Sequence, residues 1–112
     1  MVAPLEDVTV VEIDNWMASP SAGAILADLG ANVIKVEPLS GDPMRNMGRP
    51  AKVPDEKKDF DYQFDVSNRG KRSITVDLDS SDGIEVVRSL ISNAQRAPNA
   101  FIVSQAFPPR PR

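Results

Sequence analysis

Residues 19–37 read SPSAGAILADLGANVIKVE, and this stretch decides the fold. Ser19 is a good helix cap, because its hydroxyl can accept a hydrogen bond from an early helical N–H, and Pro20 suits the first helical position. Apolar residues then recur at helical spacing up to Gly30, which fits the left-handed conformation that ends many helices. Residues 33–37, VIKVE, are a β-branched run typical of a strand. A helix that leads directly into such a strand predicts the second half of a β-α-β unit.

The rest of the chain extends this pattern on both sides. Residues 8–13, VTVVEI, predict a first buried strand, and residues 73–78, SITVDL, predict a later one. Residues 79–82, DSSD, offer helix caps, and residues 81–94 then have apolar side chains at helical spacing. Residues 100–103, AFIV, are suited to one more short strand. Residues 38–60, rich in proline, glycine and charge, predict a long loop. The fold class is therefore α/β, a partial open parallel sheet of Rossmann-like β-α units.

The chain divides into two segments of different composition. Residues 1–95 form the predicted α/β segment, and residues 96–112 form a tail rich in proline and arginine. The ending PPRPR cannot form a helix interior or a central strand, so we expect this tail to be disordered or out of frame. Four arginines and no acid follow Glu85, but so few arginines spread over residues 88–112 are a weak signal for nucleic-acid binding. We therefore expect no nucleic-acid partner.

The amino-acid composition limits the kinds of catalysis and binding site that the chain can have. The 112 residues are 41% hydrophobic and 26% charged, with a net charge of −3 and neither cysteine nor histidine. Thiol chemistry and histidine catalysis are thus excluded, and we expect no metal site. The chain has no long apolar run and no leader pattern at its first residues, so we expect a cytoplasmic protein with no membrane contact.

Two sites are suggested by the residues alone. Glu37 ends a strand where dinucleotide folds carry a ribose-binding acid, but the G-x-G-x-x-G motif is absent, which argues against NAD. Residues 68–73, NRGKRS, are a basic loop before a strand. Such a loop either binds phosphates or is a solvated loop balanced by Asp65 and Asp77.

Three motifs in order carry a resemblance to a known family. They are LADLGANVIKVE at 26–37, GDPMR at 41–45 and GKRSITVDL at 70–78. Together they resemble the N-terminal signature of the family III CoA-transferases, the CaiB/BaiF type, over about residues 4–94. Within GDPMR, Asp42 and Arg45 are spaced to pair with each other.

The resemblance implies that coenzyme A, as CoA or acyl-CoA, is the ligand. Met17 and Ala18 lie where the family contacts the adenine end of CoA, and Lys71 lies where the family's N-x-N-K-R-S loop contributes a lysine. The implied CoA-binding residues are Met17, Ala18, Asn68, Arg69, Gly70 and Lys71. Two positions differ from the family pattern, because Gly70 replaces an asparagine and Pro38 replaces an arginine that contacts CoA.

The resemblance also implies what this stretch lacks. The family's nucleophile is an aspartate beyond the matched segment, so we assign no catalytic residue and expect the chain to be inactive alone. The motifs do not separate transfer of CoA between carboxylic acids from acyl-CoA racemisation. A free-standing CoA- or nucleotide-binding module and a non-catalytic partner of a full-length paralogue remain alternatives. Family members form interlocked homodimers, an assembly that is doubtful for a fragment.

Overall fold

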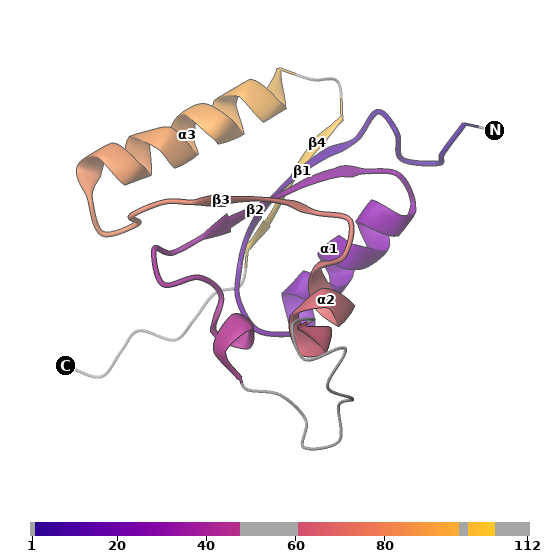
Figure 1. The fold of residues 1–112 in the computed structure, drawn as a ribbon. Coiled ribbons are helices and arrows are strands. Elements are labelled where there is room, and N and C mark those ends of the chain that lie inside the picture. Colours follow the sequence, from indigo (N-terminus) through magenta and orange to yellow (C-terminus); the bar gives the residue numbers. More distant parts are fainter. Residues whose placement is uncertain (1, 48–60, 97–98, 105–112) are drawn as a thin grey trace.

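The computed structural model describes residues 2–47, 61–96 and 99–104 as a four-stranded parallel sheet with helices on both faces (Figure 1). The elements in chain order are β1 (Thr9–Ile13), α1 (Ala18–Asp28), β2 (Asn32–Glu37), the 3-10 turn η1 (Pro43–Asn46), α2 (Tyr62–Asn68), β3 (Arg72–Thr75), α3 (Ser81–Gln95) and β4 (Ala100–Ser104). The strand order is β3-β2-β1-β4, so β1 and β2 lie in the centre. The predicted α/β class with parallel strands is confirmed.

The two faces of the sheet bury separate apolar cores. On one face α3 covers a core whose buried members include Val11, Val36, Val76 and Val87. On the other face α1 covers Val8, Val10 and Val33, with Leu26 packed against them. Because successive side chains of a strand point to opposite faces, β1 and β2 each contribute to both cores.

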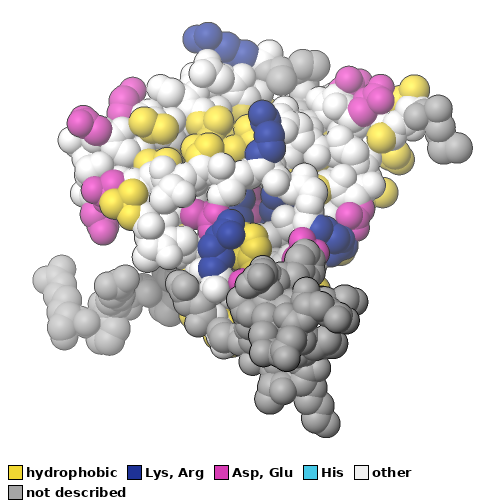
Figure 2. Space-filling model, in the orientation of Figure 1, with side chains coloured by type: hydrophobic (Ala, Val, Ile, Leu, Met, Phe, Trp, Pro, Cys, Tyr) yellow, Lys and Arg dark blue, Asp and Glu magenta, His cyan; other side chains and the backbone are white. Residues whose placement is uncertain are grey.

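In the view of Figure 2, hydrophobic side chains are visible over α3, and charged side chains of both signs are scattered over the described surface.

The ends of two helices follow their predicted signals. Gly30 has φ of +100° just after α1, which is the left-handed conformation that the sequence predicts for a helix stop. The backbone N–H of Gly83 donates to Ser80 Oγ over 2.9 Å, so Ser80 caps α3. The cap predicted at Ser19 is wrong. Helix α1 begins at Ala18 without a side-chain cap, because the Ser19 hydroxyl donates to Asp14 Oδ2 instead.

Other predictions need correction or fall outside the described part. The predicted loop at 38–60 contains η1, and its residues 48–60 lie outside the described residues. Helix α2 was not predicted; Asp61 caps it by accepting from Phe64 N over 3.1 Å. Within the predicted tail, the short strand predicted at 100–103 is present as β4, which pairs in parallel with β1. The tail residues 97–98 and 105–112 lie outside the described residues. None of the helices in the described part combines the length and apolar character needed to cross a bilayer.

Candidate functional site

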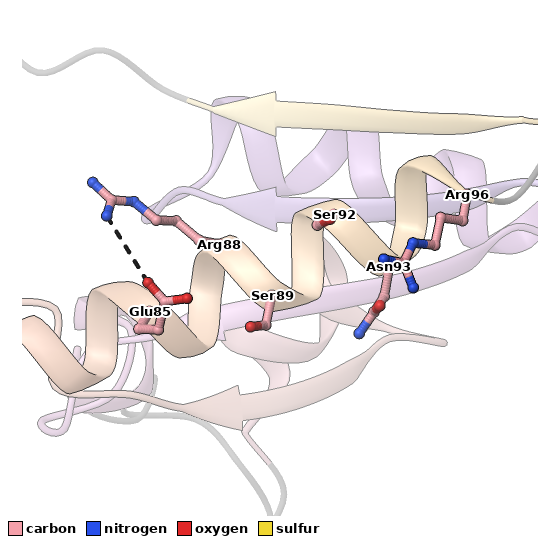
Figure 3. A pocket seen from close by; sticks show the side chains of 6 residues that line it. All are labelled: Glu85, Arg88, Ser89, Ser92, Asn93 and Arg96. Atoms are coloured by element: carbon pink, nitrogen blue, oxygen red, sulfur yellow. Dashed lines mark ion pairs between the residues drawn. The ribbon is translucent and has the colours of Figure 1, made fainter.

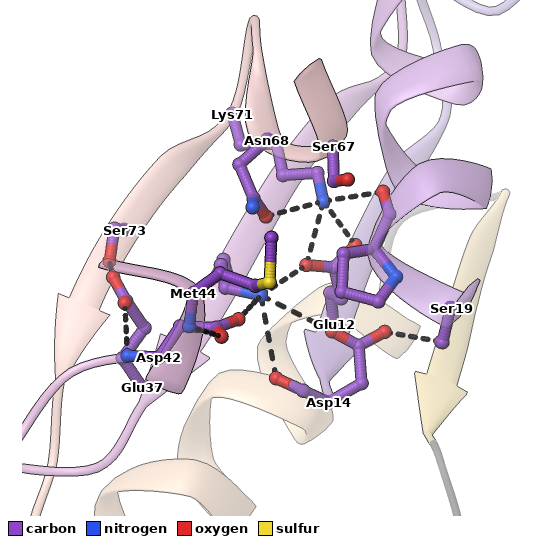
Figure 4. A network of polar contacts seen from close by, with 12 residues as sticks. Glu12, Asp14, Ser19, Glu37, Asp42, Met44, Ser67, Asn68, Lys71 and Ser73 are labelled. Carbon is purple, nitrogen blue, oxygen red and sulfur yellow. Dashed lines mark hydrogen bonds and ion pairs between the residues drawn. The ribbon is translucent and has the colours of Figure 1, made fainter. Parts of the chain in front are cut away.

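The sheet face beneath α1 changes from apolar to charged along its strands. Val10 on β1 and Val33 on β2 are buried there, and two residues further along each strand come Glu12 and Lys35. The strand register pairs Glu12 with Lys35 directly. Five side chains form a buried ionic cluster at this carboxyl half of the sheet: Glu12, Asp14, Lys35, Asp42 and Lys71 (Figure 4).

Lys35 is the centre of the cluster. Its side chain is 1% exposed, and its Nζ lies 2.9 Å from Asp42 Oδ2, 3.2 Å from Glu12 Oε2 and 3.3 Å from Asp14 Oδ1. Burial lowers the pKa of Lys35, but the hydrogen bond to Asp42 and the surrounding carboxylates outweigh burial and raise it. Lys35 is therefore a structural cation that holds three carboxylates together.

Lys71 is the second cation of the cluster. Its side chain is 2% exposed, and its Nζ donates to Glu12 Oε1 and Oε2 over 2.7 and 2.9 Å. It also donates to the backbone oxygen of Pro20 over 2.7 Å and to Asn68 Oδ1 over 2.9 Å. Burial, the largest effect, raises the pKa of Glu12 despite its contact with Lys71, and burial lowers the pKa of Lys71. The three carboxylates and two lysines give a net charge of −1 if all are ionised, which is consistent with a Glu12 that gains a proton readily.

Glu37 forms a separate ion pair beside the cluster. Its Oε1 accepts from Arg45 Nε over 2.7 Å and from the backbone N–H of Asp42 over 2.8 Å, and Ser73 Oγ donates to Oε2. Burial raises the pKa of Glu37, but these hydrogen bonds outweigh burial and lower the pKa to about 2. The local Asp42–Arg45 pair expected from GDPMR does not form, because Arg45 bonds Glu37 and Asp42 bonds Lys35. Glu37, only 2% exposed and fully engaged, is not available to a ribose.

This ion pair predicts a specific loss of stability in acid. Since the pKa of Glu37 is lowered from 4.5 to about 2, its contribution is present above pH 4.5 and is lost as the pH falls towards 2. Over this pH range we expect the free energy of unfolding of Glu37→Gln to fall less than that of the parent chain, by on the order of 2 kcal/mol. Urea denaturation at several pH values measures both slopes. Equal slopes in the two proteins would contradict the assignment, and the raised pKa of Glu12, present in both, cancels from the comparison.

The turn between β1 and α1 is tied to the same cluster. Trp16 has φ of +69°, a left-handed conformation that an aromatic residue rarely adopts. Its backbone N–H donates to Asp42 Oδ1 over 3.2 Å, and the same oxygen accepts from Met44 N over 2.9 Å. The cluster therefore holds the turn that presents Met17 and Ala18, both exposed, at the start of α1.

The structure distributes the six predicted CoA-binding residues along α1 and sorts them by exposure. Lys71 reaches the first turn of α1, where Met17 and Ala18 lie, whereas Arg69 and Gly70 lie beside Asp28 and Ala27 in its last turn. Met17, Ala18 and Gly70 are exposed, and Arg69 is half-buried and paired with Asp28 over 2.6 Å. By contrast, Asn68 and the side chain of Lys71 are buried. Met17 also lines an apolar groove of about 290 Å³ whose other lining residues are Met44, Met47, Tyr62, Gln63 and Val66.

A second hollow lies on the outer surface of α3 (Figure 3). Its lining residues are polar and lie along one side of that helix and at its C-cap: Glu85, Arg88, Ser89, Ser92, Asn93 and Arg96. The only ion pair drawn among them joins Arg88 to Glu85 over 3.9 Å, and both side chains are largely exposed. This surface is a solvated helix face, and its polar lining differs from that of the apolar groove at Met17. Within the described ranges, no three acidic side chains are grouped so that they could hold a metal ion.

Sequence reasoning missed the buried charges of the strands. Glu12 and Lys35 were read as parts of apolar strands, although each interrupts a run of β-branched residues at the same distance from its start. A charged residue of opposite sign at the same place in two neighbouring parallel strands was the available signal. Asp14 and Asp42 carried no such signal, since only the fold brings the two turns to Lys35.

Comparison with known proteins identifies the family of this chain. Residues 5–101 match the family model of CoA-transferase family III. The chain is 38% identical over 90 residues to a (R)-2-hydroxy-4-methylpentanoate CoA-transferase of Clostridioides difficile, covering 80% of this chain and 22% of that protein. It is 40% identical over 107 residues to a succinyl-CoA–D-citramalate CoA-transferase of Chloroflexus aurantiacus, covering 95% of this chain and 24% of that protein.

The fold is shared as well. The crystal structure of a CAIB/BAIF family protein from Brucella suis superposes with a TM-score of 0.70 at 43% identity, covering 82% of this chain and 24% of that chain. This chain therefore spans about a quarter of the length of the relatives it matches. The motifs, the parallel sheet and these matches together show that the chain belongs to CoA-transferase family III.

Proposed function

We propose that this chain is the CoA-binding part of a family III CoA-transferase, in which CoA passes between carboxylic acids. One observation carries the proposal. The family resemblance assigns residues 17–18 and 68–71 to CoA, and the second segment reaches the start of α1, where the first lies, although the two are far apart in sequence. Lys71 Nζ joins them by donating to the backbone oxygen of Pro20, in the first turn of α1. The relatives described above are named as transferases, which favours CoA transfer over racemisation.

The surface around these segments suits the two ends of a CoA molecule. The apolar groove beside Met17 offers thioether and aromatic surface for the adenine ring or the pantetheine chain. The N-terminus of α1, where Met17 and Ala18 lie, favours an anion. The site thus offers an apolar surface and a positive end next to each other.

In this proposal the described residues bind CoA, and none of them forms a covalent bond with the acyl group. Glu12, Asp14, Asp42 and Glu37 are each held by a cation, so no buried carboxylate of the described part is free to attack a thioester. The nucleophile belongs to a further part of the enzyme, and we expect no turnover of acyl-CoA by this chain alone. From the family we also propose a cytoplasmic location and a homodimer of interlocked chains. Exposed apolar side chains at Ile25, Leu29 and Leu39 support packing against further protein.

Ligand-induced stabilisation tests the proposal. We expect CoA and acetyl-CoA to raise the midpoint of thermal unfolding, because a ligand at 100 times its Kd stabilises the folded state by about 2.7 kcal/mol. ATP, which has the adenine and phosphates without pantetheine, should stabilise less. Met17→Glu should abolish the shift by placing a negative charge at an exposed position beside the CoA phosphates.

The matched control is Val86→Glu, which also replaces an apolar residue by glutamate; Val86 lies on α3 and is 51% exposed, close to the 52% of Met17. It should leave the CoA-induced shift unchanged. An equal shift with ATP would favour the nucleotide-binding module, and no shift with either CoA compound would refute CoA binding.

A further inference from the structure

The ammonium of Lys71 does not lie at the surface, where it could bind a phosphate directly. Its ammonium has three protons, and its neighbours supply four oxygen atoms within 2.9 Å, two from Glu12 and one each from Pro20 and Asn68 (Figure 4). With its side chain only 2% exposed, a contact with a phosphate would require all of these bonds to break. It would also leave the buried Glu12 with Lys35 as its sole cation. The ammonium is an anchor inside the protein.

Glu12 fixes the position of this anchor. The carboxylate is fully buried, and both of its oxygens accept from Lys71. Helix α1 passes so close above the pair that a Cβ on Gly23 would lie 1.9 Å from Glu12 Oε1 and 3.1 Å from Lys71 Cε. The absence of a side chain at residue 23 is therefore what gives the pair its space, and the tight packing leaves little room for another arrangement.

The anchor determines where the 68–71 loop (Asn68–Lys71) sits. Through Pro20 the ammonium joins the loop to the first turn of α1, and through Asn68 it joins the loop to the last turn of α2. Asn68 in turn donates from Nδ2 to the backbone oxygen of Phe64 over 3.0 Å. Between the two anchored residues, the exposed Gly70 has φ of +74°, and a Cβ there would lie 3.2 Å from Ala27 Cβ in the last turn of α1.

We propose that Glu12 is a positioning residue for CoA binding, which acts through Lys71 to hold the tip of the 68–71 loop at a fixed distance from Met17 and Ala18. The ligand in this inference rests on the function proposed above. Preorganisation of this kind raises affinity because the loop does not have to be ordered when the ligand binds. Direct contact between Lys71 and CoA predicts the opposite response to loss of Glu12, since the freed ammonium would then gain access to the ligand.

Two substitutions separate these possibilities. Glu12→Gln keeps the shape of the side chain and leaves Asp14, Asp42, Lys35 and Lys71 as a neutral set, so we expect the protein to fold. The double substitution Glu12→Gln with Lys71→Gln restores the formal charge of the parent cluster while replacing the ion pair by two amides. Glu85→Gln, on the exposed side of α3, is the matched control.

We expect Glu12→Gln to weaken CoA binding about tenfold, as for loss of a hydrogen bond between charged groups. The double substitution should weaken it no further, because both changes break the same connection. Glu85→Gln should bind as the parent does. If Glu12→Gln binds CoA as tightly as the parent or more tightly, and the double substitution then loses affinity, Lys71 contacts CoA directly and the inference is wrong.

A measurement without ligand keeps this test separate from the test of the function. Amide hydrogen exchange of residues 69–73 should be faster in Glu12→Gln than in the parent, while exchange of α3 stays the same in both. If the parent chain binds no CoA but exchange responds in this way, the proposed function fails and the anchoring of the loop by Glu12 holds. Unchanged exchange at 69–73 would overturn the anchoring itself.

Discussion

Lys35→Met is expected to destabilise the chain by about 3–5 kcal/mol, the usual cost of removing one partner from a buried ion pair. The substitution leaves Glu12, Asp14 and Asp42 buried with Lys71 as the remaining cation. Because a domain of this size is stable by only about 5–15 kcal/mol, this loss removes a large part of the total. Urea denaturation followed by circular dichroism measures it.

Arg88→Met is the matched control for Lys35→Met, since it also replaces a cation by methionine. Arg88 is 73% exposed in its side chain and lies 3.9 Å from Glu85, so we expect a change below about 1 kcal/mol. If Lys35→Met is as mild as Arg88→Met, the carboxylates around Lys35 are protonated or hydrated, and the ionic cluster does not hold the centre of the sheet.

Gly83→Ala is the second substitution with a large expected effect, and its sign is contrary to helix propensity. Replacing glycine by alanine inside a helix normally stabilises by about 1 kcal/mol. Here a Cβ on Gly83 would lie 1.8 Å from the backbone oxygen of Asp77 and 2.7 Å from its carbonyl carbon. Backbone atoms cannot move aside as a flexible side chain can, so we expect a net destabilisation of about 1–3 kcal/mol.

Ser89→Ala, at an exposed position of the same helix, is the control and should be neutral or slightly stabilising. The urea midpoints of the two variants show whether the close contact with the Asp77 carbonyl outweighs the gain in helix propensity. A Gly83→Ala protein as stable as Ser89→Ala would mean that the first turn of α3 stands further from the Asp77 carbonyl than the structure places it.

The regular elements could be predicted because their signals are local. Apolar spacing, the glycine stop at Gly30 and the cap at Ser80 all act within a few residues, and these predictions were confirmed. Helix α2 could not be predicted in the same way, because seven residues offer too few apolar repeats. It is stabilised by packing against α1 and by the cap at Asp61.

The candidate site could be predicted only in part, for a related reason. The family resemblance pointed to residues 17–18 and 68–71, but it did not reveal that Lys71 is buried against Glu12, 59 positions away in sequence. The sequence also did not show which hydrogen-bond partners these side chains would choose. The Ser19 hydroxyl donates to Asp14, and Arg45 donates to Glu37. Such choices between hydrogen-bond partners are made by tertiary packing, which the spacing of residues does not encode.

The most direct test of CoA binding by this chain is an amide-resolved NMR titration with CoA. We expect saturable shifts at Met17, Ala18 and residues 68–71, where the structure brings the two segments together. The amides of α3 that surround the polar hollow, from Glu85 to Arg96, should stay unchanged. Shifts confined to α3, or no saturable shifts at all, would contradict the account.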